Sequence, residues 1–207
     1  MTINTNRRNT TLTGTTAAFL SAIAIGSIAG CTFETHNTTV NGGQDARSAP
    51  RAGNSVTDKQ MMSRLGSLEG EWESQDADGN WNTAAVFSVS SNGSVVREIM
   101  FPGSPSEMTN LYHMDGTNAV VTHYCAIGNQ PRMVAKGITK TADGPAIDYE
   151  FDSVSNLRQS HTHVMDSLRV IFIDDDHIRQ DWTSTPTDKS ADAEPARTMS
   201  FNLRRKH

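Results

Sequence analysis

The feature that most constrains the fold is a series of short strand patterns separated by tight turns. In the clearest of them, Ile147, Tyr149 and Phe151 alternate with two acidic residues. Alternation of apolar and polar residues with a period of two is typical of a β-strand with one buried face. Between two other such stretches lies Asn92-Gly93, a pair that favours a two-residue hairpin turn. Repeated strands with short turns predict an antiparallel meander.

The expected strands begin at Gly70 and continue over 84–90, 94–101, 108–114, 119–126, 132–139, 147–151, 163–173, 177–183 and 199–203. A meander of this length has to close on itself or stack as two sheets, because exposed edge strands pair with other chains. We expect an all-β fold, an antiparallel up-and-down barrel with one short N-terminal helix that begins near Thr57. A sandwich is the alternative. A barrel of about eight or more strands can enclose one small ligand.

The N-terminal region has the pattern of an export signal. Arg7 and Arg8 precede 15–30, a run of Ala, Ile, Leu, Ser and Gly that is too short and too polar for a membrane span of about 20 residues. The run ends immediately before Cys31. This arrangement resembles the bacterial lipoprotein signal, in which cleavage precedes a cysteine that then carries acyl chains. A plain secretory signal with an incidental cysteine is the alternative.

The lipoprotein resemblance implies three segments and a location. Residues 1–30 are the expected signal peptide, 31–56 a flexible tether rich in Thr, Asn and Gly, and 57–207 the barrel domain. Acyl chains on Cys31 would anchor the exported protein to a membrane of the bacterial cell envelope. The chain has 207 residues, a formal net charge of −5 and no basic stripe, which argues against a nucleic acid as a partner.

A second resemblance concerns the domain itself. Gly70-x-Trp72 follows a short helix and opens the first strand, as in lipocalin-like (calycin) barrels. The stretches 101–108, 122–133 and 174–182 are similar to those of uncharacterised bacterial lipocalin-like secreted proteins, and the resemblance extends over 65–204. It implies a lipocalin-like barrel that binds a small, mainly apolar or amphipathic molecule inside. It brings no established reaction and no known cofactor.

Polar residues gather in 122–133, which combines the end of a strand with the turn after it. Such side chains at a barrel mouth would orient the polar end of a ligand through hydrogen bonds. The expected ligand-binding residues are His123, Tyr124, Asn129, Gln130 and Arg132, together with Glu107, which ends the loop before the expected strand 108–114. The alternative is an internal network that closes one end of the barrel, in which the Asn and Gln side chains cap backbone groups.

Strand alternation adds two expectations. His123 and Cys125 share one face of their strand and Tyr124 lies on the other, but the pattern leaves open which face is inward. Glu98 lies on an otherwise apolar strand face, so its carboxylate is expected to be buried or paired, with Arg132 as a candidate partner.

Three other functions stay open beside the favoured non-catalytic binding protein. A hydrolase or isomerase would use His123 with Cys125 and Arg132, because a nearby histidine can lower the pKa of a thiol. A haem or metal protein would use histidines such as His161 and His163, which stand at a His-x-His spacing found in metal sites. A structural envelope protein would have a filled barrel. The identity of a cofactor does not follow from the sequence.

Overall fold

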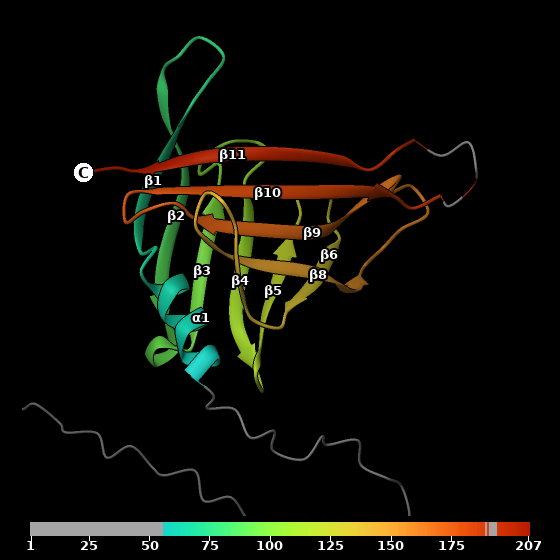
Figure 1. Cartoon of the computed structure of the whole chain (residues 1–207). Helices are drawn as coiled ribbons and strands as arrows, with labels where there is room; N and C mark the ends of the chain where they lie inside the picture. The colour runs from blue at the N-terminus through green and yellow to red at the C-terminus, as the bar shows by residue number, and fades with distance from the viewer. Residues whose placement is uncertain (1–55, 189, 191–193) are drawn as a thin grey trace, which may run out of the picture. The chain divides into compact units, whose positions relative to one another are not determined.

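The computed structural model describes residues 56–188, 190 and 194–207 (Figure 1). The expected signal peptide 1–30, nearly all of the tether 31–56 and the lipidation site Cys31 lie outside the described residues. In the part of the chain that is described, no helix is both long and apolar enough to cross a membrane.

The described residues form one α-helix, one short 3₁₀ turn (Ser91–Gly93) and eleven strands. The elements are α1 (Val56–Gly66), β1 (Gly70–Gln75), β2 (Trp81–Ser90), β3 (Val95–Met100), β4 (Met108–Asp115), β5 (Asn118–Tyr124), β6 (Gln130–Ala135), β7 (Ile138–Lys140), β8 (Pro145–Ser155), β9 (His163–Phe172), β10 (His177–Pro186) and β11 (Arg197–Arg205). Each expected strand is present within a few residues of its expected bounds, except for the stretch 132–139.

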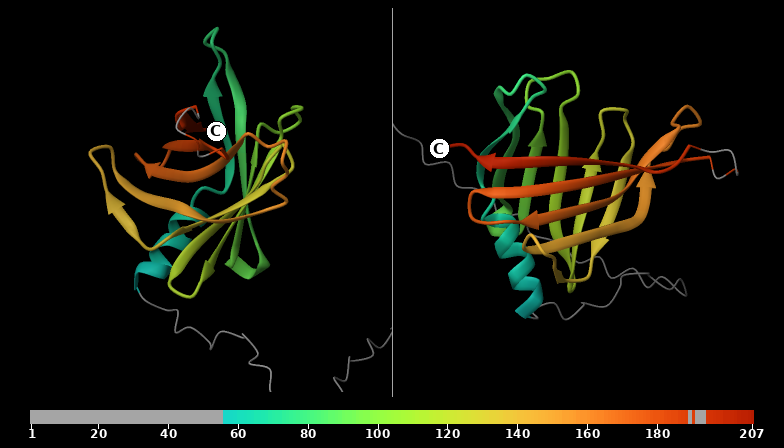
Figure 2. Two further views of the ribbon diagram at one scale, coloured as in Figure 1. Left: turned by 90° about the vertical axis from the view of Figure 1, so that its right-hand side faces the viewer. Right: turned by 45° about the horizontal axis from the view of Figure 1, so that its top comes forward.

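The strands close into a barrel. They pair antiparallel in the order β6-β5-β4-β3-β2-β1-β11-β10-β9-β8-β7, and β6 also pairs with β8. That last pairing closes ten strands, all except β7, so the predicted antiparallel up-and-down barrel with one short helix is confirmed. In the views of Figures 1 and 2, β8–β11 run across β2–β6, so the two walls face each other at a steep angle.

The expected strand 132–139 is two strands. β6 ends at Ala135 and β7 begins at Ile138, and both pair with the same strand, β8, at successive positions along it. Gly137 lies between them, and glycine inside a strand pattern often marks a break because it has no side chain to pack. The break lets the chain leave β5 while it continues along β8.

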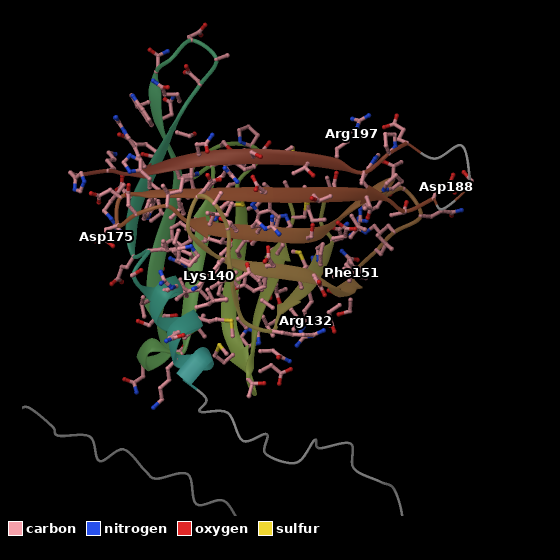
Figure 3. The ribbon with its side chains drawn as sticks, in the orientation of Figure 1. Arg132, Lys140, Phe151, Asp175, Asp188 and Arg197 are labelled. Atoms are coloured by element: carbon pink, nitrogen blue, oxygen red, sulfur yellow. The ribbon has the colours of Figure 1, made fainter. Side chains whose placement is uncertain are left out.

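Antiparallel connectivity gives the barrel two ends. The helix end carries α1 and the turns after β2, β4 and β9, and the mouth end carries the turns after β1, β3, β5, β8 and β10. Asp175 in the turn after β9 and Asp188 in the loop after β10 lie at opposite ends of these strands (Figure 3).

Large apolar side chains fill the barrel toward the helix end. Trp72 and Phe87 meet edge to face with their ring centroids 6.4 Å apart, and α1 adds Met61 and Leu65, all of them buried. Burial of a side chain of this size contributes about 1.5–3 kcal/mol to folding. The apolar face of α1 therefore covers the core at this end.

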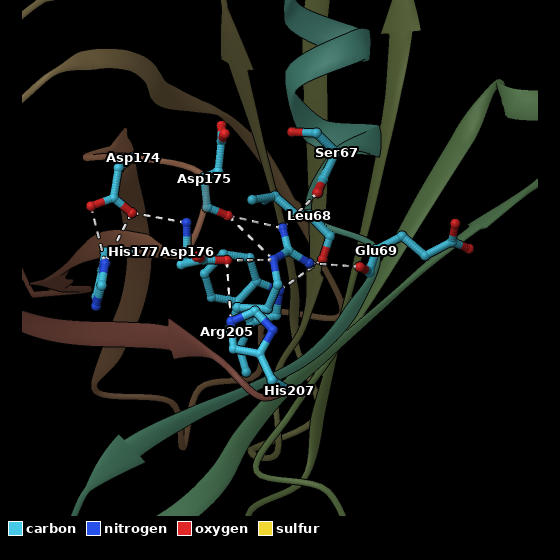
Figure 4. A network of polar contacts seen from close by, with 10 residues as sticks. Ser67, Leu68, Glu69, Asp174, Asp175, Asp176, His177, Arg205 and His207 are labelled. Carbon is cyan, nitrogen blue, oxygen red and sulfur yellow. Dashed lines mark hydrogen bonds and ion pairs between the residues drawn. The ribbon is translucent and has the colours of Figure 1, made fainter.

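Arg205 connects three segments of the chain at the helix end (Figure 4). Its guanidinium carbon lies 4.4 Å from the ring centroid of Trp72, and its nitrogens donate to three backbone carbonyls. These are the carbonyl oxygens of Ser67 at 2.8 Å, Glu69 at 2.9 Å and Asp175 at 3.2 Å. One side chain thus joins the end of α1, the start of β1 and the turn after β9.

Replacement of this arginine is expected to destabilise the domain. Arg205→Ala leaves the three carbonyls without their charged donor and uncovers Trp72, so we expect a loss of about 2–3 kcal/mol of unfolding free energy. Urea denaturation measures the change. Arg197→Ala is the matched control, because the Arg197 side chain is 65% exposed and its ion pair with Glu194 lies at the surface. Equal unfolding curves for the two variants would contradict the role of Arg205.

Candidate functional site

Polar side chains are buried inside the barrel, and β5 shows which of the expected residues lie there. His123 is 1% exposed and lies on the inward face with Val121, whereas Tyr124 points outward and is 45% exposed. Asn129, which directly precedes β6, is fully buried and shares its face with the buried Pro131 and Met133. Of the expected ligand-binding residues, the structure therefore places His123 and Asn129 inside the barrel.

We call six buried side chains the interior polar network: Glu98, Asn110, Tyr112, His123, Gln180 and Trp182. Glu98 is its centre. Its carboxylate accepts hydrogen bonds from Asn110 Nδ2 at 2.8 Å, the Tyr112 hydroxyl at 2.6 Å and Gln180 Nε2 at 2.8 Å. Glu98 is thus buried and paired as expected, but its partners are neutral, and Arg132 is not among them.

The network spans the barrel from wall to wall. Glu98 on β3 bonds Gln180 on β10, and the His123 and Trp182 rings, from β5 and β10, lie 4.8 Å apart between centroids. A second contact of this kind joins Tyr112 on β4 to Tyr149 on β8, with ring centroids 6.0 Å apart. These contacts divide the apolar core at the helix end from the mouth end.

Burial controls the charge of this layer. Desolvation raises the pKa of the Glu98 carboxyl, against the opposing effect of its three hydrogen bonds. Desolvation also raises the pKa values of the Tyr112 and Tyr149 hydroxyls, with a further contribution from Glu98. It lowers the pKa of His123 to about 4, so the imidazole is neutral at pH 7.

Besides His163 Nε2 at the start of β9, four buried side-chain polar atoms have no hydrogen-bond partner among the described residues. They are His123 Nε2, both amide atoms of Asn129 and the Tyr149 hydroxyl. An unsatisfied buried polar atom costs about 1–3 kcal/mol, so most such atoms in native proteins are satisfied by protein, water or a ligand. The interior therefore offers hydrogen-bonding capacity that the described residues do not use.

An apolar pocket opens at the same end of the barrel. The pairing of β8 with β9 stops at Glu150 and Ser167, and beyond it β8 pairs with β6 while β9 pairs with β10. The resulting gap holds a pocket of about 490 Å³, which we call the mouth pocket. It is lined by Phe151, Val154, Leu157, Val164, Asp166, Thr185, Pro186 and Thr187. Phe151 is 46% exposed although it pairs with the buried Met133.

The other expected ligand-binding residues have protein partners outside the interior. Arg132 forms ion pairs with Asp152 at 2.5 Å and Asp115 at 3.1 Å. Gln130 bonds the Gly128 carbonyl and the Ser155 hydroxyl. Glu107 accepts from the backbone N–H of Gly103 at 2.7 Å and so closes its own loop. The structure does not bring these three side chains together with His123.

The histidine pair lies at the mouth end but not on one strand face. His161 precedes β9 and accepts from the Arg158 backbone N–H through Nδ1 at 3.1 Å, whereas His163 is the first residue of β9 and lies 4.0 Å from Glu194. Among the described residues, no three His, Cys, Asp or Glu side chains gather in a way that could hold a metal ion.

The possible catalytic cluster does not assemble either. His123 lies inside the barrel and Arg132 pairs outside it, while Cys125 is half-buried in the turn, where its backbone N–H donates to the Asn129 carbonyl at 3.1 Å.

Sequence reasoning missed most of the interior polar network, namely Asn110, Tyr112, Gln180 and Trp182, together with Tyr149. A signal existed for Gln180, because it alternates with the apolar residues Ile178 and Trp182 and so shares their buried face. No protein-family model matches this chain, and none of the curated proteins matches its sequence. The candidate site therefore depends on its own geometry.

Proposed function

We propose that this protein binds a small, mainly apolar molecule at the mouth end of its barrel and orients the polar group of that molecule with His123 and Asn129. The observation that carries the proposal is the set of buried polar atoms without a partner in the described part of the chain, because two inward-facing side chains at one end of the barrel supply three of them. A ligand group that satisfies them gains hydrogen bonds in a site already shielded from water.

The mouth pocket supports an amphipathic ligand. Its lining combines apolar side chains, such as Phe151, Val154 and Leu157, with three polar ones, Asp166, Thr185 and Thr187. Ligand pockets are commonly apolar with a small number of polar groups that fix orientation, and about 300–1,000 Å³ is their usual size. The mouth pocket of about 490 Å³ falls within this range.

The proposal also covers the cellular location of the protein and its relation to lipocalin-like lipoproteins. The N-terminal pattern supports export, acylation of Cys31 and attachment to a membrane of the bacterial cell envelope, with 31–56 as a tether. Gly70-x-Trp72 and the antiparallel barrel support a place among lipocalin-like lipoproteins. The partner is then a small apolar or amphipathic molecule that the anchored barrel takes up beside the membrane.

A pair of substitutions tests the binding site. Phe151→Asp places a carboxylate in the mouth pocket and should weaken the binding of the hydrophobic dye N-phenyl-1-naphthylamine about tenfold, since the loss of one aromatic contact is worth about 1.4 kcal/mol or more. Fluorescence titration of the purified full chain measures the affinity.

The matched control is Ile173→Asp. Ile173 is 42% exposed, close to the 46% of Phe151, but lies at the helix end of the barrel. We expect this variant to bind the dye as the unchanged protein does. Equal weakening by both substitutions, or by neither, would place dye binding elsewhere and contradict the proposed site.

A further inference from the structure

The interior polar network fixes the direction of a chain of hydrogen bonds. Trp182 has a donor but no acceptor on its indole nitrogen, so the oxygen of Gln180 that it contacts at 3.2 Å is the acceptor. The amide nitrogen of Gln180 therefore faces Glu98 Oε1 and donates to it at 2.8 Å. This branch establishes the Glu98 carboxyl group as an acceptor.

The second branch runs from Glu98 to His123. Asn110 directs Nδ2 at Glu98 Oε2 at 2.8 Å, which turns its carbonyl oxygen toward His123. That oxygen lies 2.7 Å from His123 Nδ1. Because an amide oxygen only accepts, Nδ1 must carry the imidazole proton.

The tautomer determines whether His123 Nε2 is a hydrogen-bond donor or an acceptor. A neutral imidazole with its proton on Nδ1 has a lone pair and no proton on Nε2. Nε2 is buried and has no partner among the described residues. Burial of the ring keeps the neutral form at pH 7, because desolvation lowers the pKa of His123. His123 Nε2 is thus a buried hydrogen-bond acceptor without a partner among the described residues.

The surroundings of Nε2 disfavour an anion. His123 Nε2 is itself an acceptor, the carboxyl of Glu98 is reached through a single intervening Asn110, and the cationic Arg132 is held outside the barrel by Asp115 and Asp152. A buried carboxylate or phosphate would therefore lose its hydration without gaining a positive partner at this position.

We infer that the polar group of the ligand is a hydrogen-bond donor without a negative charge, a hydroxyl or an N–H group, and that it donates to His123 Nε2. The inference rests on the proposed function and narrows it, since it favours alcohols and amides over fatty acids, esters and ethers. Specificity of this kind is typical of buried sites, in which a ligand that lacks the donor leaves the acceptor unsatisfied.

Two isomers and one acid test the inference. 1-Octanol and heptyl methyl ether have the same atoms and nearly the same length, but only the alcohol has a donor, while octanoate has the same chain with a negative charge. Isothermal titration calorimetry of each compound with the purified full chain gives the affinities. We expect the alcohol to bind about tenfold or more tightly than the ether and the octanoate.

The outcomes separate the two proposals. Equal affinities of the alcohol and the ether, or tighter binding of the ether or the octanoate, would overturn the donor inference while leaving a binding barrel. Binding of none of the three would overturn the proposed function and the inference together. Tyr124→Phe is the control variant, since Tyr124 points outward and its loss should leave the order of affinities unchanged.

A second measurement does not depend on a ligand. The long-range ¹H–¹⁵N NMR spectrum of the imidazole rings distinguishes a protonated from an unprotonated ring nitrogen. We expect His123 to show its proton on Nδ1 and a bare Nε2 at pH 7. A proton on Nε2 would reverse the hydrogen-bond chain through Asn110 and overturn the inference.

Discussion

Glu98→Ala is expected to cost the domain about 4 kcal/mol of unfolding free energy. The substitution leaves three buried donors, on Asn110, Tyr112 and Gln180, without their acceptor, and it removes side-chain atoms from a fully buried position. Each unsatisfied buried donor costs about 1–3 kcal/mol, and the cavity adds to the loss. Because small domains are stable by about 5–15 kcal/mol, this change removes a large part of the total.

Urea denaturation of paired variants checks this expectation. Glu150→Ala is the matched control, since Glu150 is exposed on the outer face of β8, and we expect a change within about 0.5 kcal/mol. Glu98→Gln keeps one acceptor oxygen, so its loss should fall between the other two. If Glu98→Ala unfolds at the same urea concentration as Glu150→Ala, the interior polar network does not stabilise the barrel.

Acid is expected to destabilise the protein through His123. The folded pKa of His123 is about 4, below the ordinary value of 6.5, so between these values the unfolded chain binds the proton more readily than the folded one. The stability contributed by the neutral imidazole is complete above pH 6.5 and is lost as the pH falls toward 4. The shift corresponds to a loss of about 3 kcal/mol.

The comparison with His123→Gln isolates this contribution. Gln can still donate to Asn110 but does not titrate. Glu98 acts in the opposite direction, because its raised pKa makes the folded state bind a proton above the usual range, so its contribution decreases as the pH rises. Both proteins contain Glu98, and the difference between their unfolding free energies at about pH 7 and about pH 4 therefore reports His123. Parallel pH profiles would contradict the buried, neutral histidine.

The barrel could be predicted because the apolar–polar pattern that indicates a strand lies within the strand's own residues. Ile147, Tyr149 and Phe151 alternate with polar residues, and β8 contains all three. The turn conformations were harder to predict from the sequence. Asn92-Gly93 predicted a two-residue turn, whereas the loop between the paired Ser90 and Val95 has four residues. Three of them have positive φ, at 52° for Ser91, 54° for Asn92 and 83° for Gly93. The same residue types occur in several turn types, so the residues alone do not determine which turn forms.

The site was harder to predict from the sequence than the fold, because it depends on how the strands are arranged in the barrel. Alternation showed that His123 and Tyr124 lie on opposite faces, but only the closed barrel shows that His123 is inside. The same rule applied to Asn129 and Arg132 separates them, so no single face could present the whole expected set. The bond from Glu98 to Gln180 joins residues on β3 and β10, and their proximity follows from barrel closure rather than from any local pattern.

The most direct test of binding at the mouth end is an NMR titration of the ¹⁵N-labelled full chain with 1-octanol. We predict saturable changes in the His123 imidazole and in the Asn129 side-chain amide, because His123 Nε2 and both amide atoms of Asn129 lie buried at the mouth end without hydrogen-bond partners among the described residues. Signals of Gly144 and Ile173, near the helix end, should stay unchanged. Saturable changes confined to the helix end, or none at either end, would contradict a ligand site in the mouth of this barrel.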